Sequence, residues 1–403
     1  MLGQQVWVCG IMPIMFRLGL SIAASTACMA CGFSVGGVTD GPLPDVSDAP
    51  PDTVLGNCAP VEVKASGDHT CARTNDGATY CWGRGENGEL GVAPLTESCS
   101  APAQDCSSTP RLVSIPAATA LGTGTFHVCA TTAATTYCWG YNGLGQYGDG
   151  ATADAVPTKA VAQRAGATEI EGGTFHTCSL LNGHVSCSGK NDAGEVGDNT
   201  IGTPQITATD VMQNATSLAT GAYNSCAIDG NHDVYCWGRN SYKQIDVTQL
   251  DKLKPTKVTT VSNAQSVASG TDHVCVTHPD KTAQCWGSNT VGQIGNGLTS
   301  PSPQPPLLVA VPAVVEIRAD LYHTCVRDDA GAIWCFGEGY AATPVKIALP
   351  RPAIAFATGG HHDCAITDDH TLYCWGGQEF GQLGNGIKAS SRTTTPQKVT
   401  LCP

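Results

Sequence analysis

The sequence has few charged and few aromatic residues. Only 14% of its 403 residues are Asp, Glu, Lys or Arg, and only 6% are Phe, Trp or Tyr. Helical periodicity is also scarce, whereas 47 glycines are spread along the chain. This composition fits an all-β repeat protein better than several separate domains.

Basic residues are particularly scarce. The chain has 21 Lys and Arg against 34 Asp and Glu, a formal net charge of −13. Because phosphate binding depends on Lys and Arg, this balance argues against nucleic acid and anionic membranes as partners. The P-loop and H-E-x-x-H motifs are absent as well. We therefore expect a monomer that is not an enzyme and uses no catalytic residues, cofactor or metal.

Cysteine, in contrast, is abundant, with 21 residues. Most cysteines form pairs nine or ten positions apart that recur about every 50 residues, a period in the range of propeller blades. The pairs are Cys71 and Cys81, Cys129 and Cys138, Cys178 and Cys187, Cys226 and Cys236, Cys275 and Cys285, Cys325 and Cys335, and Cys364 and Cys374. So many cysteines indicate an oxidising compartment.

Each cysteine pair is predicted to lie on a β-hairpin, with the two cysteines directly opposite each other. A separation of nine then leaves a two-residue loop, which in the third copy is Asn182-Gly183, the strongest short hairpin signal. A separation of ten leaves a three-residue loop whose last residue is Gly77 in the first copy and Gly331 in the sixth, as an αL position requires. Opposed cysteines of this kind can form a disulfide in every copy.

Two further strands are expected in each copy. One precedes the hairpin, as at 61–65 and 266–269. The other is predicted to open with a proline, which is tolerated at the start of an edge strand. These prolines are Pro110, Pro157, Pro255, Pro344 and Pro396. Four antiparallel strands in each of seven copies predict an all-β, seven-bladed propeller over residues 58–403.

Four other cysteines test this architecture. Cys99 and Cys106 lie in an insertion of the first copy and are predicted to pair. Cys58 precedes the first blade and Cys402 follows the last. Because those two points are neighbours in a closed ring, we predict a bond between them, worth roughly 5 to 6 kcal/mol in the chain-entropy model.

The N-terminus resembles an export signal. Residues 1–30 contain one basic residue, Arg17, followed by an apolar run and small residues, with Met15 as an alternative start. The segment is similar to a bacterial lipoprotein signal, which implies lipidation at Cys31, with Cys28 as the alternative acceptor and simple cleavage as the other outcome. The Pro- and Asp-rich residues 31–57 are predicted to form a disordered tether. We expect an exported protein, anchored at the outer membrane or cell surface or secreted, that meets a membrane only through the lipid.

The repeated pattern G-x-x-H-x-C-A, then Y-C-W-G, then G-Q-L-G resembles the regulator of chromosome condensation repeat. Some copies depart from it: Ser188 and Phe336 replace Trp, Asn224 replaces His, the fourth copy lacks the G-Q-L-G glycines and the sixth lacks that loop. The resemblance implies the propeller fold. The founder of the family is a guanine-nucleotide exchange factor on chromatin, a role that does not suit an exported acidic protein. Secreted relatives include a β-lactamase-inhibitory propeller.

The repeated histidines and tryptophans are interpreted as structural. The histidines should lie far apart on successive blades and act as hydrogen-bonding groups rather than metal ligands. They are His69, His127, His176, His273, His323 and His362. The tryptophans should pack blades rather than line a ligand site. They are Trp82, Trp139, Trp237, Trp286 and Trp375.

Topology predicts a binding face. The residue just before each repeated His lies in a loop near the axis, and four of the seven such residues are aromatic, which suits a protein-binding cluster. These residues are Asp68, Phe126, Phe175, Tyr223, Asp272, Tyr322 and His361. The alternative is that the aromatics pack within the molecule. The insertion around Cys99 should share this face, and Cys58 should lie on the opposite side.

Three functions follow from this interpretation. The first is a non-enzymatic scaffold for an extracellular or envelope protein. The second is an inhibitor of an extracellular enzyme such as a β-lactamase or protease. The third, a carbohydrate-active enzyme, requires carboxylates that converge in the central channel.

Overall fold

In every repeat the two hairpin cysteines face each other across neighbouring antiparallel strands. The computed structural model describes residues 58–99 and 104–402. Within them all seven pairs are disulfide-bonded, with Cα atoms 4.0 to 4.2 Å apart. The predicted register and intrablade disulfides are confirmed. The predicted signal, the lipidation site at Cys31 or Cys28, and the tether lie outside the described residues.

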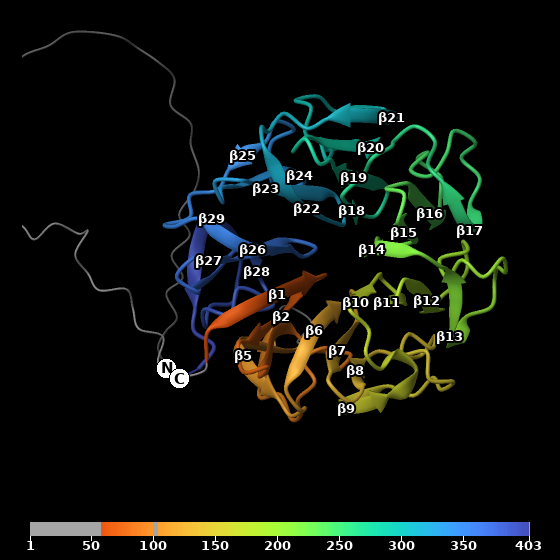
Figure 1. Cartoon of the computed structure of the whole chain (residues 1–403). Helices are drawn as coiled ribbons and strands as arrows, with labels where there is room; N and C mark the ends of the chain where they lie inside the picture. The colour runs from red at the N-terminus through yellow and green to blue at the C-terminus, as the bar shows by residue number, and fades with distance from the viewer. Residues whose placement is uncertain (1–57, 100–103, 403) are drawn as a thin grey trace, which may run out of the picture. The chain divides into compact units, whose positions relative to one another are not determined.

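The strands form seven antiparallel sheets, or blades, around a common axis; six have four strands, and the first has a fifth, short strand at its outer edge (Figure 1). Blade 1 contains β1 (Pro60–Ser66), β2 (His69–Thr74), β3 (Thr79–Arg84) and β5 (Gln104–Val113), with β4 (Glu97–Cys99) beside β5; blade 2 contains β6 (Ala118–Thr123), β7 (His127–Thr132), β8 (Thr136–Gly140) and β9 (Ala155–Val161), followed by the 3-10 helix η2 (Ala162–Arg164). Blade 3 contains β10 (Glu169–Gly172), β11 (His176–Leu181), β12 (His184–Gly189) and β13 (Gln205–Met212), and blade 4 contains β14 (Ala215–Thr220), β15 (Asn224–Asp229), β16 (Val234–Gly238) and β17 (Lys252–Lys257). Blade 5 contains β18 (Ser266–Ser269), β19 (His273–Thr277), β20 (Ala283–Asn289) and β21 (Ser300–Leu308); blade 6 contains β22 (Val314–Asp320), β23 (His323–Asp328), β24 (Ile333–Gly337) and β25 (Val345–Lys346); blade 7 contains β26 (Ala353–Thr358), β27 (His362–Thr367), β28 (Leu372–Gln378) and β29 (Ala389–Val399). The predicted seven-bladed propeller is confirmed.

The hairpin loops have the conformations that their residues favour. Asn182 and Gly183 both have positive φ, at 50° and 81°, as a type I′ turn requires. The third loop residues Gly77 and Gly331 have φ of 85° and 79°. The turn chemistry therefore fixes the register that brings the cysteines together.

The prediction that outer strands open with proline is wrong for most blades. β5, β17 and β29 begin several residues before Pro110, Pro255 and Pro396. In each of these strands the proline lies in a β-bulge, where the pairing register shifts. In β17, for example, Thr256 pairs with Cys236 and Lys252 pairs with Gly238, and Pro255 lies between them. A bulge on an edge strand has no ladder bond for proline to break, so proline is tolerated there.

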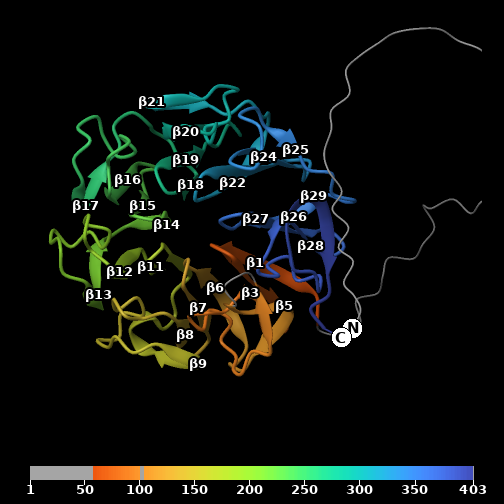
Figure 2. The same ribbon diagram turned by 180° about the vertical axis from the view of Figure 1, so that it is seen from behind.

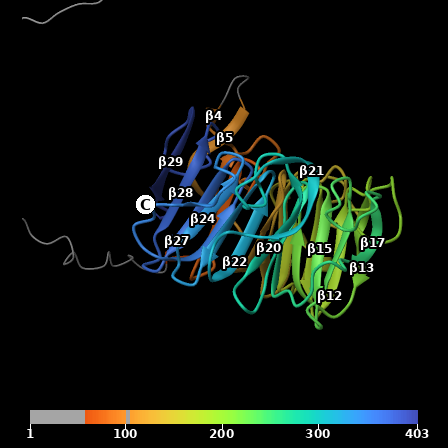
Figure 3. The ribbon, with the colours of Figure 1, turned by 90° about the horizontal axis from the view of Figure 1, so that it is seen from above.

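The ring closes without sharing a strand between the first and last blades. Blade 1 and blade 7 are each built from consecutive strands, and β1 lies beside β26 (Figure 2). Cys58 and Cys402, 344 positions apart in sequence, form a disulfide with Cα atoms 6.4 Å apart. This predicted closure is confirmed. The blades stand side by side when the ring is seen edge-on (Figure 3).

The core lies mainly between blades. All five repeated tryptophans are at most 2% exposed. The indole N–H of Trp139 donates to Glu89 O in blade 1 at 2.7 Å, and that of Trp237 donates to Glu195 O in blade 3 at 2.9 Å. These two tryptophans therefore connect their blades to the G-Q-L-G loop of the preceding blade.

Blade 3 fills the place of its missing tryptophan with an arginine. Arg164 of η2 is 1% exposed, and its guanidinium donates to Tyr147 O, Ser179 Oγ and Thr177 O at 2.8 to 3.1 Å. Nη2 also donates to Ser188 Oγ. Burial lowers the pKa of Arg164 to about 10. The serine substitution is thus compensated from the connector between blades.

Candidate functional site

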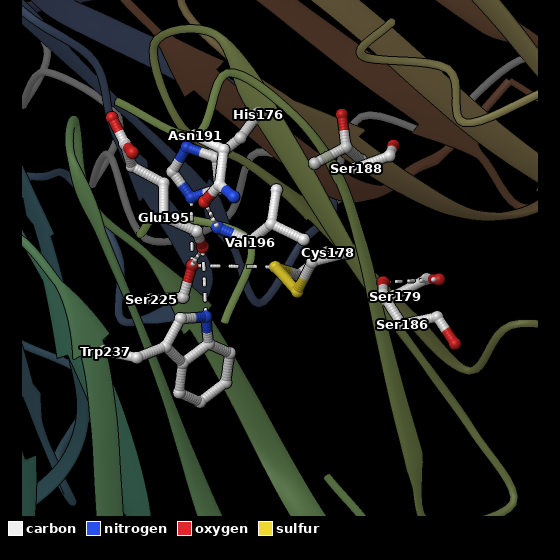
Figure 4. The surroundings of a disulfide bond; sticks show 12 residues. His176, Cys178, Ser179, Ser186, Ser188, Asn191, Glu195, Val196, Ser225 and Trp237 are labelled. Carbon is white, nitrogen blue, oxygen red and sulfur yellow. Dashed lines mark hydrogen bonds between the residues drawn. A yellow bond between two sulfur atoms is a disulfide. The ribbon is translucent and has the colours of Figure 1, made fainter. Parts of the chain in front are cut away.

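The repeated histidines connect successive blades by hydrogen bonds. His176 Nε2 lies 2.9 Å from Ser225 Oγ of blade 4, and that hydroxyl donates to Glu195 O at 3.0 Å (Figure 4). Because the Ser225 hydroxyl donates its proton to the loop carbonyl oxygen of Glu195, the Nε2–H of His176 is the donor to the Ser225 oxygen. The same bond joins His127 to Thr177, His273 to Thr324 and His362 to Thr70 at 2.6 to 2.8 Å.

We call the junction between two neighbouring blades a seam. Two seams of the ring lack this bond. The position that holds Thr or Ser elsewhere is Val128 in blade 2, and Nε2 of the buried His69 in blade 1 has no partner. In blade 5 the corresponding residue is Val274, and Asn224 of blade 4 donates to Ser269 Oγ at 2.8 Å instead. The relay therefore depends on a hydroxyl at one position of each repeat.

The seam between blades 6 and 7 uses a carboxylate. His323 Nε2 lies 2.8 Å from Asp363 Oδ1, and Tyr340 Oη donates to Asp363 Oδ2 at 2.5 Å. Burial alone would raise the pKa of Asp363, but these two contacts outweigh burial and hold its pKa below the usual value. Trp375 donates its indole N–H to Tyr340 Oη at 2.8 Å. Tyr340 thus replaces the loop carbonyl that blade 6 lacks.

One group of side chains in the described part of the chain has the composition of a metal site. His323, Cys325 and Asp363 have ligand atoms within 4.8 Å of one another. However, Cys325 Sγ is bonded to Cys335, and Asp363 already accepts hydrogen bonds from His323 and Tyr340. This group acts as a link between blades.

The enzymatic alternative requires carboxylates that converge in the central channel, and a cavity lined by inner strands of several blades contains Glu171 and Asp320. Glu171 pairs with Lys64 at 2.6 Å, so that blades 1 and 3 are joined. Glu62 pairs with Arg73 at 2.9 Å, and Glu316 with Arg318 at 3.0 Å. The Lys64–Glu171 pair links inner strands of two blades, whereas the Glu62–Arg73 and Glu316–Arg318 pairs each lie within one blade.

The predicted face brings together two positions of each repeat. The carbonyl of the residue before the repeated His accepts a hydrogen bond from the N–H of the residue that follows the Trp-Gly pair. These bonds join Arg84 to Asp68, Tyr141 to Phe126, Lys190 to Phe175, Arg239 to Tyr223, Ser288 to Asp272, Glu338 to Tyr322 and Gly377 to His361. Side chains at both positions therefore lie on the same face.

In blades 1 to 4 these two positions supply three cations and four aromatic rings, and Phe380 of blade 7 lies beside them. The Arg84 guanidinium lies 5.6 Å from the ring centre of Phe380 and 5.8 Å from that of Phe126. The Phe126 and Phe175 rings stack with centres 5.1 Å apart. Further contacts join Lys190 to Phe175 and Tyr223, and Arg239 to Tyr223, at 5.3 to 6.0 Å. We call Phe380, Arg84, Phe126, Tyr141, Phe175, Lys190, Tyr223 and Arg239 the cation–aromatic arc.

The predicted face residues differ in exposure. Tyr322 is 40% exposed, and His361 is also exposed. Phe126, Phe175 and Tyr223 are half-buried within the arc, as is Asp68 beside it. Asp272 is buried at 6% exposure.

Charges at the ends of the arc are perturbed by their neighbours. Burial raises the pKa of Asp272, with Arg239 Nη1 3.8 Å away opposing that shift. His361 Nδ1 lies 3.3 Å from Asp68 Oδ1. This contact raises the pKa of His361. The same contact, against the effect of burial, lowers the pKa of Asp68.

Sequence reasoning missed the cationic half of the arc. Arg84, Lys190 and Arg239 share one signal, a basic residue directly after Trp-Gly or its equivalent. The insertion lies on the predicted side, because Gly85 N–H donates to Asp105 O at 2.9 Å. Cys58 lies on the opposite side, since the next residue, Ala59, accepts from Asn75 N–H in a hairpin turn. Cys99 and Cys106 are disulfide-bonded as predicted.

Comparison with known proteins supports the repeat assignment. Two models, both described as regulator of chromosome condensation (RCC1) repeat, match residues 61–89, 215–244, 264–293 and 353–382, and residues 76–131, 231–277 and 369–403. The human regulator of chromosome condensation is 30% identical over 100 residues, which cover 21% of this chain and 24% of that protein.

Solved structures share the fold. Prp20p from Saccharomyces cerevisiae, whose binding to Gsp1p and histones has been described, superposes with a TM-score of 0.69 at 20% identity, covering 85% of this chain and 87% of that chain. Human WBSCR16 superposes with a TM-score of 0.69 at 19% identity, covering 80% and 94%. The repeats, the fold and the matching models together place this chain in the regulator of chromosome condensation repeat family.

Proposed function

We propose that this propeller is a non-enzymatic scaffold that binds another protein through the cation–aromatic arc. The observation that carries the proposal is that Arg84, Lys190 and Arg239 each lie against a half-buried aromatic ring on one face of blades 1 to 4. Aromatic residues and Arg are the residue types that dominate protein interface hot spots.

The rigidity of the arc favours binding. Each cation is held by a ring and by a carboxylate, as Lys190 is by Asp192 at 3.3 Å. Side chains that are already ordered lose little conformational entropy when a partner binds. The exposed ring of Tyr322 extends this face to blade 6.

The disulfides favour an extracellular or envelope partner. Nine disulfides in residues 58–402 point to an oxidising environment. In the described residues we find no helix with the length and apolar character needed to cross a membrane. The lipoprotein-like leader would place the protein at an outer membrane or cell surface. Structures at 19 to 21% identity carry the fold only, so we do not extend nucleotide exchange to this chain.

The test is affinity capture of envelope and culture proteins with the full chain. A Lys190→Glu/Arg239→Glu variant reverses two arc charges that are not in the core. A matched control, Lys281→Glu/Lys388→Glu, changes the net charge equally at exposed or half-exposed sites outside the arc. We expect the arc variant to lose the captured partner and the control to retain it. Equal capture by both variants would refute the arc as the binding site.

A further inference from the structure

The fourth blade departs from the repeat at the loop that closes each seam. In the other blades that keep this loop, two glycines flank the E/Q-hydrophobic pair, as Gly194 and Gly197 do in blade 3. In blade 4 the equivalent residues are Lys243 and Asp246.

The glycines matter because the loop touches the next blade with its backbone. A Cβ on Gly194 would lie 2.9 Å from Leu253 Cα, and one on Gly197 would lie 2.7 Å from Trp237 Cδ1. Gly197 N–H also donates to Gly194 O at 3.0 Å, which closes the turn. A side chain at either position would therefore collide with the next blade in this arrangement. Blade 4 keeps the seam bond, since the indole N–H of Trp286 donates to Gln244 O at 2.8 Å, and only the outer turn of its loop differs.

Blade 4 shows the consequence. Asp246 N–H turns to Asn240 Oδ1 at 3.3 Å rather than to the carbonyl of Lys243. A groove of about 290 Å³ opens between this loop and blade 5. Its lining includes Ile245, Val247, Trp286 and three prolines of β21, Pro303, Pro305 and Pro306.

The groove is apolar at its base and carries one free cation at its edge. Ile245 and Trp286 are each 2% exposed, whereas Val247 on the outer wall is 75% exposed. Asp246 is paired with Lys252 at 2.5 Å. In the part of the chain that the structure covers, no carboxylate lies within ion-pair distance of the exposed Lys243 ammonium.

Lys243 also has an unusual backbone conformation, with φ of 58°. A non-glycine residue in the left-handed region is disfavoured and is often found at functional sites. Glycine, which the other blades use there, would remove this strain.

We infer that the groove between blades 4 and 5 binds a peptide segment of another protein in which an apolar side chain is followed by Asp or Glu. The apolar side chain would enter between Trp286 and the prolines, and the carboxylate would pair with Lys243. The segment would not add a strand to β21, because proline provides no N–H for strand pairing. This site is separate from the cation–aromatic arc.

The experiment selects binding peptides from a phage-displayed library of random heptapeptides on the immobilised full chain. A parallel selection uses Lys243→Gly, which supplies the glycine that the other blades have at this position and removes the ammonium group. We expect peptides that bind only the natural chain and share an apolar residue beside Asp or Glu. Failure to enrich any peptide that distinguishes the two proteins would overturn the inference.

Charge reversal tests the role of Lys243 directly. For a selected peptide measured by fluorescence anisotropy, Lys243→Glu should weaken binding by about fivefold or more, as loss of an exposed ion pair allows. Exchange of the peptide acid for its amide should have the same effect on the natural chain. Binding that is insensitive to both changes would contradict the proposed carboxylate contact.

Folding controls accompany the selection. Lys281 also has positive φ, 63°, in a hairpin turn of blade 5. Lys281→Gly should keep full peptide binding, whereas Lys243→Gly should lose it without a lower thermal midpoint. The arc variant Lys190→Glu/Arg239→Glu should bind the peptide normally, so that the two proposed sites can be tested independently.

Discussion

Tyr340 donates a hydrogen bond to the buried carboxylate of Asp363, and the same phenol oxygen accepts the indole N–H of Trp375. This arrangement explains how blade 6 dispenses with the loop that joins other blades. The Tyr340 phenol takes the place of the loop carbonyl that accepts the indole N–H elsewhere, and the Asp363 carboxylate takes the place of the hydroxyl that binds the histidine. The missing loop of blade 6, Tyr340 and Asp363 are separate departures from the repeat in sequence, but together they form one hydrogen-bonded unit.

Tyr340→Phe should therefore destabilise the ring strongly. Asp363 would lose a donor and Trp375 an acceptor, and losing a hydrogen bond to a buried charged group costs about 1.5 to 3 kcal/mol. The free energy of unfolding in guanidinium measures this loss. Tyr373→Phe, which removes a half-buried phenol of blade 7, should change it by less than about 0.5 kcal/mol. Equal effects of the two changes would rule out the proposed unit.

Val128→Thr should stabilise the protein. The new hydroxyl would give the orphan Nε2 of His69 a partner and could donate to Glu89 O, as Thr324 does to Gln293 O. A net gain of about 1 kcal/mol is expected from such a bond. The reverse change, Thr177→Val, should destabilise by about 1 to 3 kcal/mol because it leaves His127 unpaired. A destabilising Val128→Thr would contradict the relay.

Stability should fall in mild acid. Burial lowers the pKa of His69, His127, His176 and His273 to about 3, and that of His362 to about 4. In the unfolded chain these groups titrate near 6.5, so from pH 6.5 down to about 4 the unfolded state binds more protons. Each histidine then removes about 1.4 kcal/mol of stability per pH unit.

Buried carboxyls oppose this trend, since burial raises the pKa of Glu89, Glu169, Glu195 and Asp272 as well as that of Asp320. Burial raises the pKa of Asp320 to about 6, so the folded state takes up its proton first and gains stability as pH falls from 6 to about 4. It offsets only one of the five histidines. The midpoint in guanidinium, with disulfides intact, should therefore be lower at pH 5 than at pH 7. A midpoint independent of pH would show that the histidines do not stay neutral.

Removal of the ring-closing disulfide should be more costly than removal of a hairpin disulfide. In the chain-entropy model Cys58→Ala/Cys402→Ala loses about 5 to 6 kcal/mol, against about 2.7 kcal/mol for Cys129→Ala/Cys138→Ala. Hydrogen exchange should increase first in β1 and β29, which the disulfide holds together. Uniform exchange across all blades would indicate that noncovalent contacts alone close the ring.

Much of the fold could be predicted because it depends on local signals. Asn182-Gly183 and Gly77 set the hairpin register, and that register places each cysteine opposite its partner. The outer strands were harder, because the bulge that admits Pro255 depends on pairing with β16 rather than on the proline itself.

The binding face was predicted only in part. Phe126 and Phe175 follow from their place before the repeated His, but the cations beside them come from a different loop of each blade. The burial of Arg164 and the groove at Lys243 depend on contacts between blades. Neither feature could therefore be predicted from the sequence of a single repeat. Substitutions at a seam can be interpreted only when the neighbouring blade is known.

Site-specific photo-crosslinking tests the central claim most directly. A benzoylphenylalanine placed at Tyr322, or at Phe126 in the arc, should crosslink the captured partner. The same group at His232, an exposed residue in a hairpin turn on the opposite side, should not. Crosslinks from His232 and none from the arc face would contradict the account.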